Sequence, residues 1–243
     1  MIADSESKNV QRDERGAMRG IFVTFEGGEG SGKTTQLKLL ANRIRASGKE
    51  VIETHDPGGT AIGKEIRTLL LDPGSAPIAS TTELLLYEAS RAQLVRELIA
   101  PTLRQGVVVL CDRFTDSTLA YQGFGRSLDL DLIQRLNRCA TDGVVPDLTI
   151  LFDLDPEIGL TRCRRDTSLD AVTGSGAEPA CWDRIEAEPL EFHRRIREGY
   201  LALARENRDR MIVIDAGVGV TEIETIVWNQ FIRLQGRCVN AVS

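Results

Sequence analysis

A glycine-rich segment near the amino terminus carries the residue types that bind polyphosphates. Gly27, Gly32, Lys33 and Thr34 fill the spacing G-x-x-x-x-G-K-[ST]. Glycines at this spacing let successive backbone N–H groups converge on phosphate oxygens at the positive end of the next helix. Lys33 would then reach the β- and γ-phosphates, and the Thr34 hydroxyl would hold Mg²⁺. The residues predicted to bind the nucleoside triphosphate are Gly27, Gly28, Glu29, Gly30, Ser31, Gly32, Lys33, Thr34 and Thr35.

A second candidate for chemistry is Asp112, which directly follows the apolar run VVVLC at 107–111. Such a run is typical of a strand buried on both faces of a parallel sheet. In open α/β sheets ligands bind at the carboxyl ends of the strands, where an acidic residue can hold a metal beside a triphosphate. We therefore expect Thr34 and Asp112 to form a Mg²⁺ site. The polar and aromatic segment after Asp112 predicts a functional loop.

Alternating strands and helices surround these residues. The phosphate loop follows an apolar run and opens a helical segment at 33–47. Further strands are expected at 51–54, 107–111, 148–154 and 211–215, and further helices at 62–71, 82–103, 129–140, 189–207 and 220–234, with another beginning at Pro156. This alternation predicts a three-layer α/β P-loop fold with a five-stranded parallel sheet.

The length of 243 residues suits a single domain with short appendages. Residues 1–19 are polar and charged without periodicity, and we expect a flexible tail before a domain at 20–243. The stretch 167–181 is rich in Gly, Ser, Ala and Asp, a composition that predicts a mobile flap with turn character.

Composition excludes several classes of function. A net charge of −6 argues against a broad nucleic-acid surface. We find no run of ~20 apolar residues for a membrane span and no signal peptide, and we expect a cytoplasmic protein without membrane partners. The five cysteines are scattered and form no C-x-x-C pair, so reduced thiols are expected.

Several separate motifs resemble those of the thymidylate kinases and occur in the order found in that family. They are FEGGEGSGKTTQ, DPGGT, the arginine of IRTLLL, YEASRAQ, DRFTDSTLAYQG, PDLTILFDLDPE and DRIE. The resemblance extends from Arg19 to the last helix. It implies a homodimeric enzyme that phosphorylates dTMP to dTDP with ATP and Mg²⁺, on a five-stranded parallel P-loop core.

The resemblance also implies roles for residues of the acceptor site. Arg67 and Arg113 would clamp the monophosphate, a task that suits the guanidinium fork. Tyr87 would stack on thymine, Arg91 would reach the base edge, and Tyr121 would line the sugar. The residues implied to bind the acceptor are Glu29, Asp56, Pro57, Arg67, Tyr87, Arg91, Arg113, Ser117, Tyr121 and Gln122.

Members of this family differ in where they carry a catalytic arginine. Some have it in the phosphate loop, and others have it in a lid, which here would span about 162–184. Because this loop offers only Lys33 as a cation, the chain resembles the bacterial lid type. We hypothesise that Arg165 stabilises the transferred phosphoryl group, and Arg184 is a weaker candidate. The residues expected to act in catalysis are Lys33, Arg113, Arg162, Arg164 and Arg165.

Three departures from the family pattern leave alternatives open. His55 and Asp56 stand where Arg-Glu is usual, Tyr87 stands where phenylalanine is common, and the lid looks long. One alternative is a kinase for another pyrimidine nucleoside monophosphate, and another is a catalytically weakened paralogue. A P-loop nucleotide-binding switch is a third, although the chain lacks a guanine-reading N-K-x-D segment and its arginines cluster for a second phosphate ligand.

Overall fold

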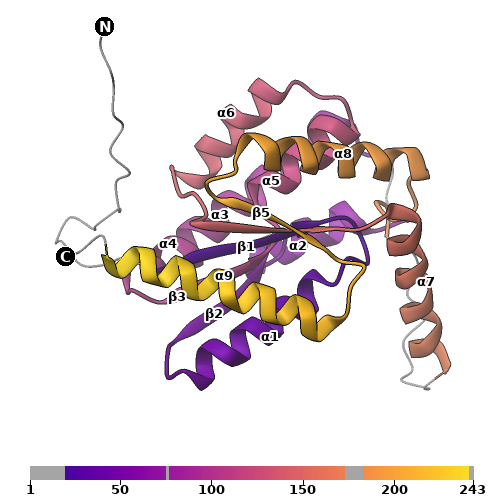
Figure 1. Ribbon diagram of the computed structural model, residues 1–243. Helices are drawn as coiled ribbons and strands as arrows, with labels where there is room; N and C mark the ends of the chain where they lie inside the picture. Colours follow the sequence, from indigo (N-terminus) through magenta and orange to yellow (C-terminus); the bar gives the residue numbers. More distant parts are fainter. Residues whose placement is uncertain (1–19, 75–76, 173–182, 241–243) are drawn as a thin grey trace, which may run out of the picture.

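A five-stranded parallel sheet lies between two layers of helices in the computed structural model (Figure 1). The structure describes residues 20–74, 77–172 and 183–240, with the side chains of 165–172 and 238–240 excepted. The three-layer α/β prediction is therefore confirmed. The predicted tail at 1–19 and much of the predicted flap lie outside the described residues.

The sheet brings the ends of all its strands to one edge. Its strands are β1 (Phe22–Gly27), β2 (Val51–His55), β3 (Val108–Asp112), β4 (Leu148–Asp153) and β5 (Met211–Asp215). The order is β2-β3-β1-β4-β5, and every neighbouring pair is parallel. Because β1 lies at the centre, the loop that follows it opens between the ends of β3 and β4. This is where open α/β sheets bind ligands.

One face of the sheet is covered by α1 (Lys33–Ala46) and α9 (Val220–Asn240), which pack against each other. Their apolar sides bury a core with Phe25 and Phe152 of the sheet, whose rings stack at a centroid distance of 6.0 Å. The helix α1 thus has its position fixed by burial along its length. The phosphate loop at its start has a rigid support.

Several helices cover the opposite face. They are α3 (Ser80–Leu94), the π-helical segment η1 (Val95–Ile99), α4 (Ala100–Arg104), α5 (Thr115–Thr118), the π-helical segment η2 (Leu119–Gly125), α6 (Leu130–Thr141) and α8 (Leu190–Glu206). In addition, α2 (Ala61–Leu71) packs on α3. The helix α7 (Pro156–Val172) contacts α8 and extends away from the sheet at its carboxyl edge (Figure 1).

The structure corrects three boundaries predicted from the sequence. The helix expected at 82–103 is divided by a π-helical turn, and the last helix continues to Asn240. The turn character predicted for the flap at 167–181 is wrong for 167–172, where α7 continues. That prediction relied on overall composition, whereas the first strong helix breaker of the stretch is Gly174.

Two further expectations, on membrane spans and on reduced cysteines, can be compared with the fold. Within the described parts of the chain, no helix combines the length and apolar character that a membrane span needs. Cys111 and Cys139 carry free thiols, as expected for reduced cysteines. Cys181 lies outside the described residues.

Candidate active site

The phosphate loop turns sharply between β1 and α1, and its backbone touches α7. Gly30 has a φ of 63°, in the left-handed region that favours glycine. A Cβ at Gly30 would lie 2.2 Å from the carbonyl oxygen of Gly159, and a Cβ at Gly159 would lie 2.2 Å from the carbonyl oxygen of Glu29. Neither position has room for a side chain. The loop and α7 therefore meet backbone to backbone.

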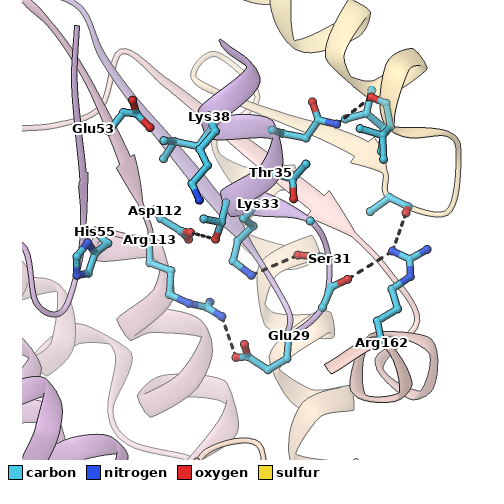
Figure 2. Close-up of a pocket in the computed structure, with 18 of the residues that line it drawn as sticks. Glu29, Ser31, Lys33, Thr35, Lys38, Glu53, His55, Asp112, Arg113 and Arg162 are labelled. Carbon is cyan, nitrogen blue, oxygen red and sulfur yellow. Dashed lines mark hydrogen bonds and ion pairs between the residues drawn. The ribbon is translucent and has the colours of Figure 1, made fainter. Parts of the chain in front are cut away.

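Lys33 crosses the loop toward the cleft (Figure 2). Its Nζ donates to the carbonyl oxygen of Gly28 over 2.7 Å and to Ser31 Oγ over 3.3 Å. Burial and the charge of Arg113 lower the pKa of Lys33. The ammonium group thus sits among the backbone groups that the motif predicts for phosphate binding.

Thr34 and Asp112 lie together at the mouth of the cleft, as predicted for the metal site. Thr34 Oγ1 donates to Asp112 Oδ2 over 2.5 Å. A hydroxyl and a carboxylate are oxygen ligands of the kind that Mg²⁺ takes. Among the described residues, no group of three or more His, Cys, Asp or Glu side chains could hold a metal ion. The two residues therefore fit an ion that takes its other ligands from phosphates and water.

The phosphate loop forms the floor of a cleft of about 890 Å³, a volume typical of nucleotide-sized ligands. One wall is apolar and is formed by residues that come after β5 in the chain, namely Val218, Val220 and Ile223. Gln36 Nε2 donates to the carbonyl oxygen of Val220 over 2.9 Å and ties this wall to α1. The cleft thus offers phosphate-binding groups at one end and an apolar surface for a base at the other.

Of the arginines proposed for the lid, Arg162, Arg164 and Arg165 lie on α7, whereas Arg184 contacts α2 and α3. Arg162 Nη1 donates to the carbonyl oxygens of Gly30 (3.4 Å) and Ala216 (3.3 Å), so its guanidinium lines the cleft (Figure 2). Arg164 is exposed on α7, and the side chain of Arg165 lies outside the described part. Arg184 pairs with Glu83 over 2.5 Å, which engages it away from the cleft.

A smaller cavity adjoins the main cleft and contains every residue that the family resemblance assigned to the acceptor. Its remaining lining residues, which were not predicted, are Leu71, Thr118, Asp183 and Ile185. Four predicted residues, Glu29, Asp56, Arg67 and Arg113, line both spaces. The cavity measures about 80 Å³ and opens beside the larger cleft.

Arg113 stands at the junction of the two spaces. Its backbone has a φ of 67°, and Nη1 donates to the carbonyl oxygen of Gly27 over 2.9 Å. Its Nη2 pairs with Glu29 Oε1 over 2.8 Å, and the Tyr121 hydroxyl donates to the same oxygen over 2.5 Å. Burial alone would raise the pKa of Glu29, but the charges of Arg113 and Lys33 outweigh it and hold that pKa at about 2.

Arg91 is buried in a network of polar groups. Nε donates to Asp56 (2.6 Å), Nη1 to Glu88 (3.0 Å) and Asn137 (2.7 Å), and Nη2 to the carbonyl oxygen of Phe114 (3.3 Å). A guanidinium has five N–H donors, so these described bonds leave one Nη2 hydrogen. Burial raises the pKa of Asp56 even though Arg91 is adjacent. Sequence reasoning identified Arg91 and Asp56 but missed Glu88 and Asn137.

Sequence reasoning also missed Glu26 and Tyr200, which lie behind Arg113. Glu26 sits near the carboxyl end of β1, where the argument used for Asp112 applies equally. Tyr200 comes from α8, and its hydroxyl accepts from Arg113 Nη1 over 3.3 Å. No local pattern distinguishes this tyrosine from the other apolar residues on the buried side of α8.

Two adjoining spaces share a wall of charged residues, one space with a phosphate loop and the other with arginines and aromatic rings. This arrangement and the parallel sheet define a P-loop nucleoside monophosphate kinase. The family model for thymidylate kinase matches residues 25–227. The chain belongs to the thymidylate kinase family.

Individual relatives give the same result. The chain is 51% identical over 208 residues to the thymidylate kinase of Geobacter sulfurreducens, covering 86% of this chain and 94% of that protein. It is 50% identical over 208 residues to the thymidylate kinase of Solidesulfovibrio magneticus, covering 86% and 97%. The crystal structure of thymidylate kinase from Ehrlichia chaffeensis has a TM-score of 0.68 at 33% identity, covering 88% of this chain and 98% of that one.

Proposed function

We propose that this chain transfers the γ-phosphoryl group of ATP to dTMP, forming ADP and dTDP, with Mg²⁺ as the metal. The observation that carries the proposal is the position of Arg113, which lines both the cleft of the phosphate loop and the cavity beside it. A cation at this junction can face the donor and acceptor phosphates together. Membership of the thymidylate kinase family supports the same reaction.

The chemical problem in this transfer is repulsion between two anionic groups. The acceptor phosphate must approach the γ-phosphoryl in line, and catalysis consists of positioning and neutralisation without a covalent intermediate. Lys33 and the loop N–H groups would hold the donor phosphates, while Arg67 and Arg113 would hold the acceptor. A bound Mg²⁺, held by Thr34 and Asp112, would neutralise charge on the β- and γ-phosphates.

The nucleoside of the acceptor would occupy the smaller cavity. Tyr87 would stack on the thymine ring, and the remaining Nη2 hydrogen of Arg91 would reach the base edge. Ser117 and Gln122 would contribute further polar contacts. The Tyr121 ring would line the sugar, where it disfavours a 2′-hydroxyl.

We infer that a lid arginine completes the neutralisation, in the manner of the bacterial lid type. Arg165 remains our proposal for the residue that faces the transferred phosphoryl. Arg162 is proposed to shape the triphosphate cleft, since it bridges the phosphate loop and the loop after β5. Arg164 is the remaining candidate on α7.

We also propose that the enzyme is a cytoplasmic homodimer. Three large apolar side chains on neighbouring helices support an interface, namely Ile62 (54% exposed), Leu69 (54%) and Leu85 (50%). Light scattering of the purified protein would test the dimer, and a mass corresponding to one chain at micromolar concentration would contradict it.

ADP release in a coupled assay tests the reaction. Purified protein receives ATP and Mg²⁺ with dTMP, dUMP, UMP, CMP or dGMP, or with no acceptor. We expect release that depends on dTMP, with the other acceptors far behind. Release of equal rate without acceptor would instead indicate a nucleotide-binding switch or ATPase, and preference for UMP or CMP would indicate a different pyrimidine kinase. Lys33→Ala, which lacks the phosphate-binding ammonium, serves as the inactive control.

A further inference from the structure

A carboxyl group lies fully buried directly behind the proposed acceptor site. Glu26 of β1 is 0% exposed. Its Oε1 accepts from the backbone N–H of Phe114 over 2.7 Å, and its Oε2 lies 2.6 Å from Ser117 Oγ and 2.8 Å from the Tyr200 hydroxyl. Charged side chains are almost never fully buried unless they are paired. In the part of the chain that the structure describes, the hydrogen-bond partners of Glu26 are all neutral.

Three oxygen atoms form a closed triangle at this point. Ser117 Oγ and the Tyr200 hydroxyl lie 2.8 Å apart, in addition to their contacts with Glu26 Oε2. Each of the three contacts needs one hydrogen, and the two hydroxyls supply two. A proton on Glu26 supplies the third, so the triangle is satisfied when the carboxyl group is neutral.

The surrounding charges agree with this assignment. Burial and the nearby charge of Asp116 raise the pKa of Glu26 to about 7, while Arg113 acts in the opposite direction. Asp116 is itself paired with Arg210 over 2.8 Å. Lys33 also faces this region. The neutral form is therefore accessible near physiological pH.

The triangle touches Arg113 directly. Arg113 Nη1 lies 3.3 Å from the Tyr200 hydroxyl and 3.5 Å from Ser117 Oγ. On its other side Nη2 pairs with Glu29. The guanidinium is thus held between a carboxylate at the mouth of the cavity and a hydroxyl pair at the back. Without that hydroxyl pair, Arg113 would keep its contacts with Glu29 and with the carbonyl oxygen of Gly27 and would lose its side-chain partners at the back.

We propose that Glu26 and Tyr200 are positioning residues for the acceptor nucleotide, and that they act by orienting Arg113 and Ser117. Neither residue lines the acceptor cavity, so each acts through a neighbour. The inference rests on the proposed function and adds to it two residues that set how the monophosphate is held. It also predicts which kinetic constant changes most, because Arg113 is proposed to hold the acceptor phosphate, whereas the donor phosphates are proposed to be held by Lys33 and the loop N–H groups.

The first test removes one hydroxyl group. Tyr200→Phe keeps the ring, which packs edge-on against Tyr121 with a centroid distance of 6.2 Å. We expect KM for dTMP to rise about fivefold to tenfold, the effect of one hydrogen bond, with KM for ATP changed less than twofold. Thr102→Val removes a buried hydroxyl on α4, remote from both spaces, and should leave both constants unchanged.

The second test separates shape from charge at Glu26. Glu26→Gln resembles the neutral carboxyl group and should keep KM for dTMP within about threefold of wild type, whereas Glu26→Leu should raise it more than tenfold. Thermal unfolding of each variant monitors folding. An unchanged KM for dTMP in both Tyr200→Phe and Glu26→Leu would overturn the inference. A large rise of KM for dTMP in Glu26→Gln would overturn the assignment of a neutral carboxyl group to Glu26.

The proposed function can fail separately from this inference. Wild-type protein that releases no ADP in response to dTMP would contradict the reaction itself. Wild-type protein that responds to dTMP, together with an unchanged KM for dTMP in both Tyr200→Phe and Glu26→Leu, would contradict the positioning role alone. Equal rises in the KM values for dTMP and ATP would also contradict it, because they indicate general structural damage.

Discussion

Thr34 Oγ1 donates a hydrogen bond of 2.5 Å to Asp112 Oδ2, although the two residues are 78 positions apart in the chain. The bond joins the first turn of α1 to the end of β3, the strand next to β1 in the sheet. The fold therefore holds the hydroxyl and the carboxylate side by side. The Thr34 hydroxyl and the Asp112 carboxylate can each be tested as a ligand of the proposed Mg²⁺ site.

Replacement of Thr34 by valine should raise the Mg²⁺ concentration that gives half-maximal rate by at least about tenfold. The reason is that the variant keeps the shape of the side chain and loses its oxygen ligand. Titration of the ADP-release assay with MgCl₂ measures this. Thr34→Ser retains the hydroxyl and should stay near wild type. Equal Mg²⁺ requirements in Thr34→Val and wild type would remove Thr34 from the metal site.

Single alanine substitutions should separate the arginines of α7. We expect Arg165→Ala to lower kcat by about 10³-fold or more, the range for an arginine that neutralises a transferred phosphoryl. Arg162→Ala should mainly raise KM for ATP, because Arg162 bridges Gly30 and Ala216 at the cleft. Steady-state kinetics with both substrates gives each constant. Near-normal kcat in Arg165→Ala would transfer the proposed role to Arg164 or Arg162.

Tyr87→Ala should raise KM for dTMP by about tenfold to a hundredfold, since stacking of a base on an aromatic ring contributes roughly 1–3 kcal/mol. Tyr87→Phe retains the ring and should change KM for dTMP less than threefold. KM for ATP is the internal reference and should not change in either variant. If the alanine variant binds dTMP normally, thymine stacks elsewhere.

Glu29 should make stability depend on pH below neutrality. Its pKa in the folded protein is about 2, against an ordinary value of 4.5. The ion pair with Arg113 therefore stabilises the protein fully above pH 4.5, by about 3 kcal/mol at most. This contribution is lost as the pH falls toward 2, because the unfolded chain takes up the proton first.

Urea unfolding of Glu29→Gln and wild type between pH 6 and pH 3 measures this effect. Wild type should have the larger free energy of unfolding at pH 6, and the difference should narrow as the pH falls. Glu157→Gln alters an exposed carboxylate on α7 and controls for the general effect of removing a charge. A difference that stays constant with pH would show that Glu29 has an ordinary pKa.

The sequence predicted the fold well because the relevant signals are local. Apolar runs such as 107–111 are typical of buried parallel strands, and their alternation with helices specifies the layers. Helix ends were harder to predict. The helix α7 continues through 167–172 because its residues have no strong breaker there, although the composition resembles that of a turn.

The candidate site was predicted where a motif names the residue, and it was incomplete where a partner comes from a distant helix. Arg91 lies in a motif, but Asn137, which accepts from it over 2.7 Å, lies 46 positions away on α6. Tyr200 likewise reaches Arg113 from 87 positions away. Such pairings depend on how the helices pack, and residue spacing carries no information about them.

The close backbone contact between Gly30 and Gly159 couples the position of the phosphate loop to that of α7, the helix that carries Arg162. Arg162 follows Gly159 by three residues, which is nearly one helical turn, so the contact sets the height of that arginine above the loop. If α7 were replaced by the corresponding helix of a relative, the arginines of that helix would reach the cleft correctly only if its first turn also packed against the phosphate loop without an intervening side chain. Exchange between family members should succeed when loop and helix are moved together.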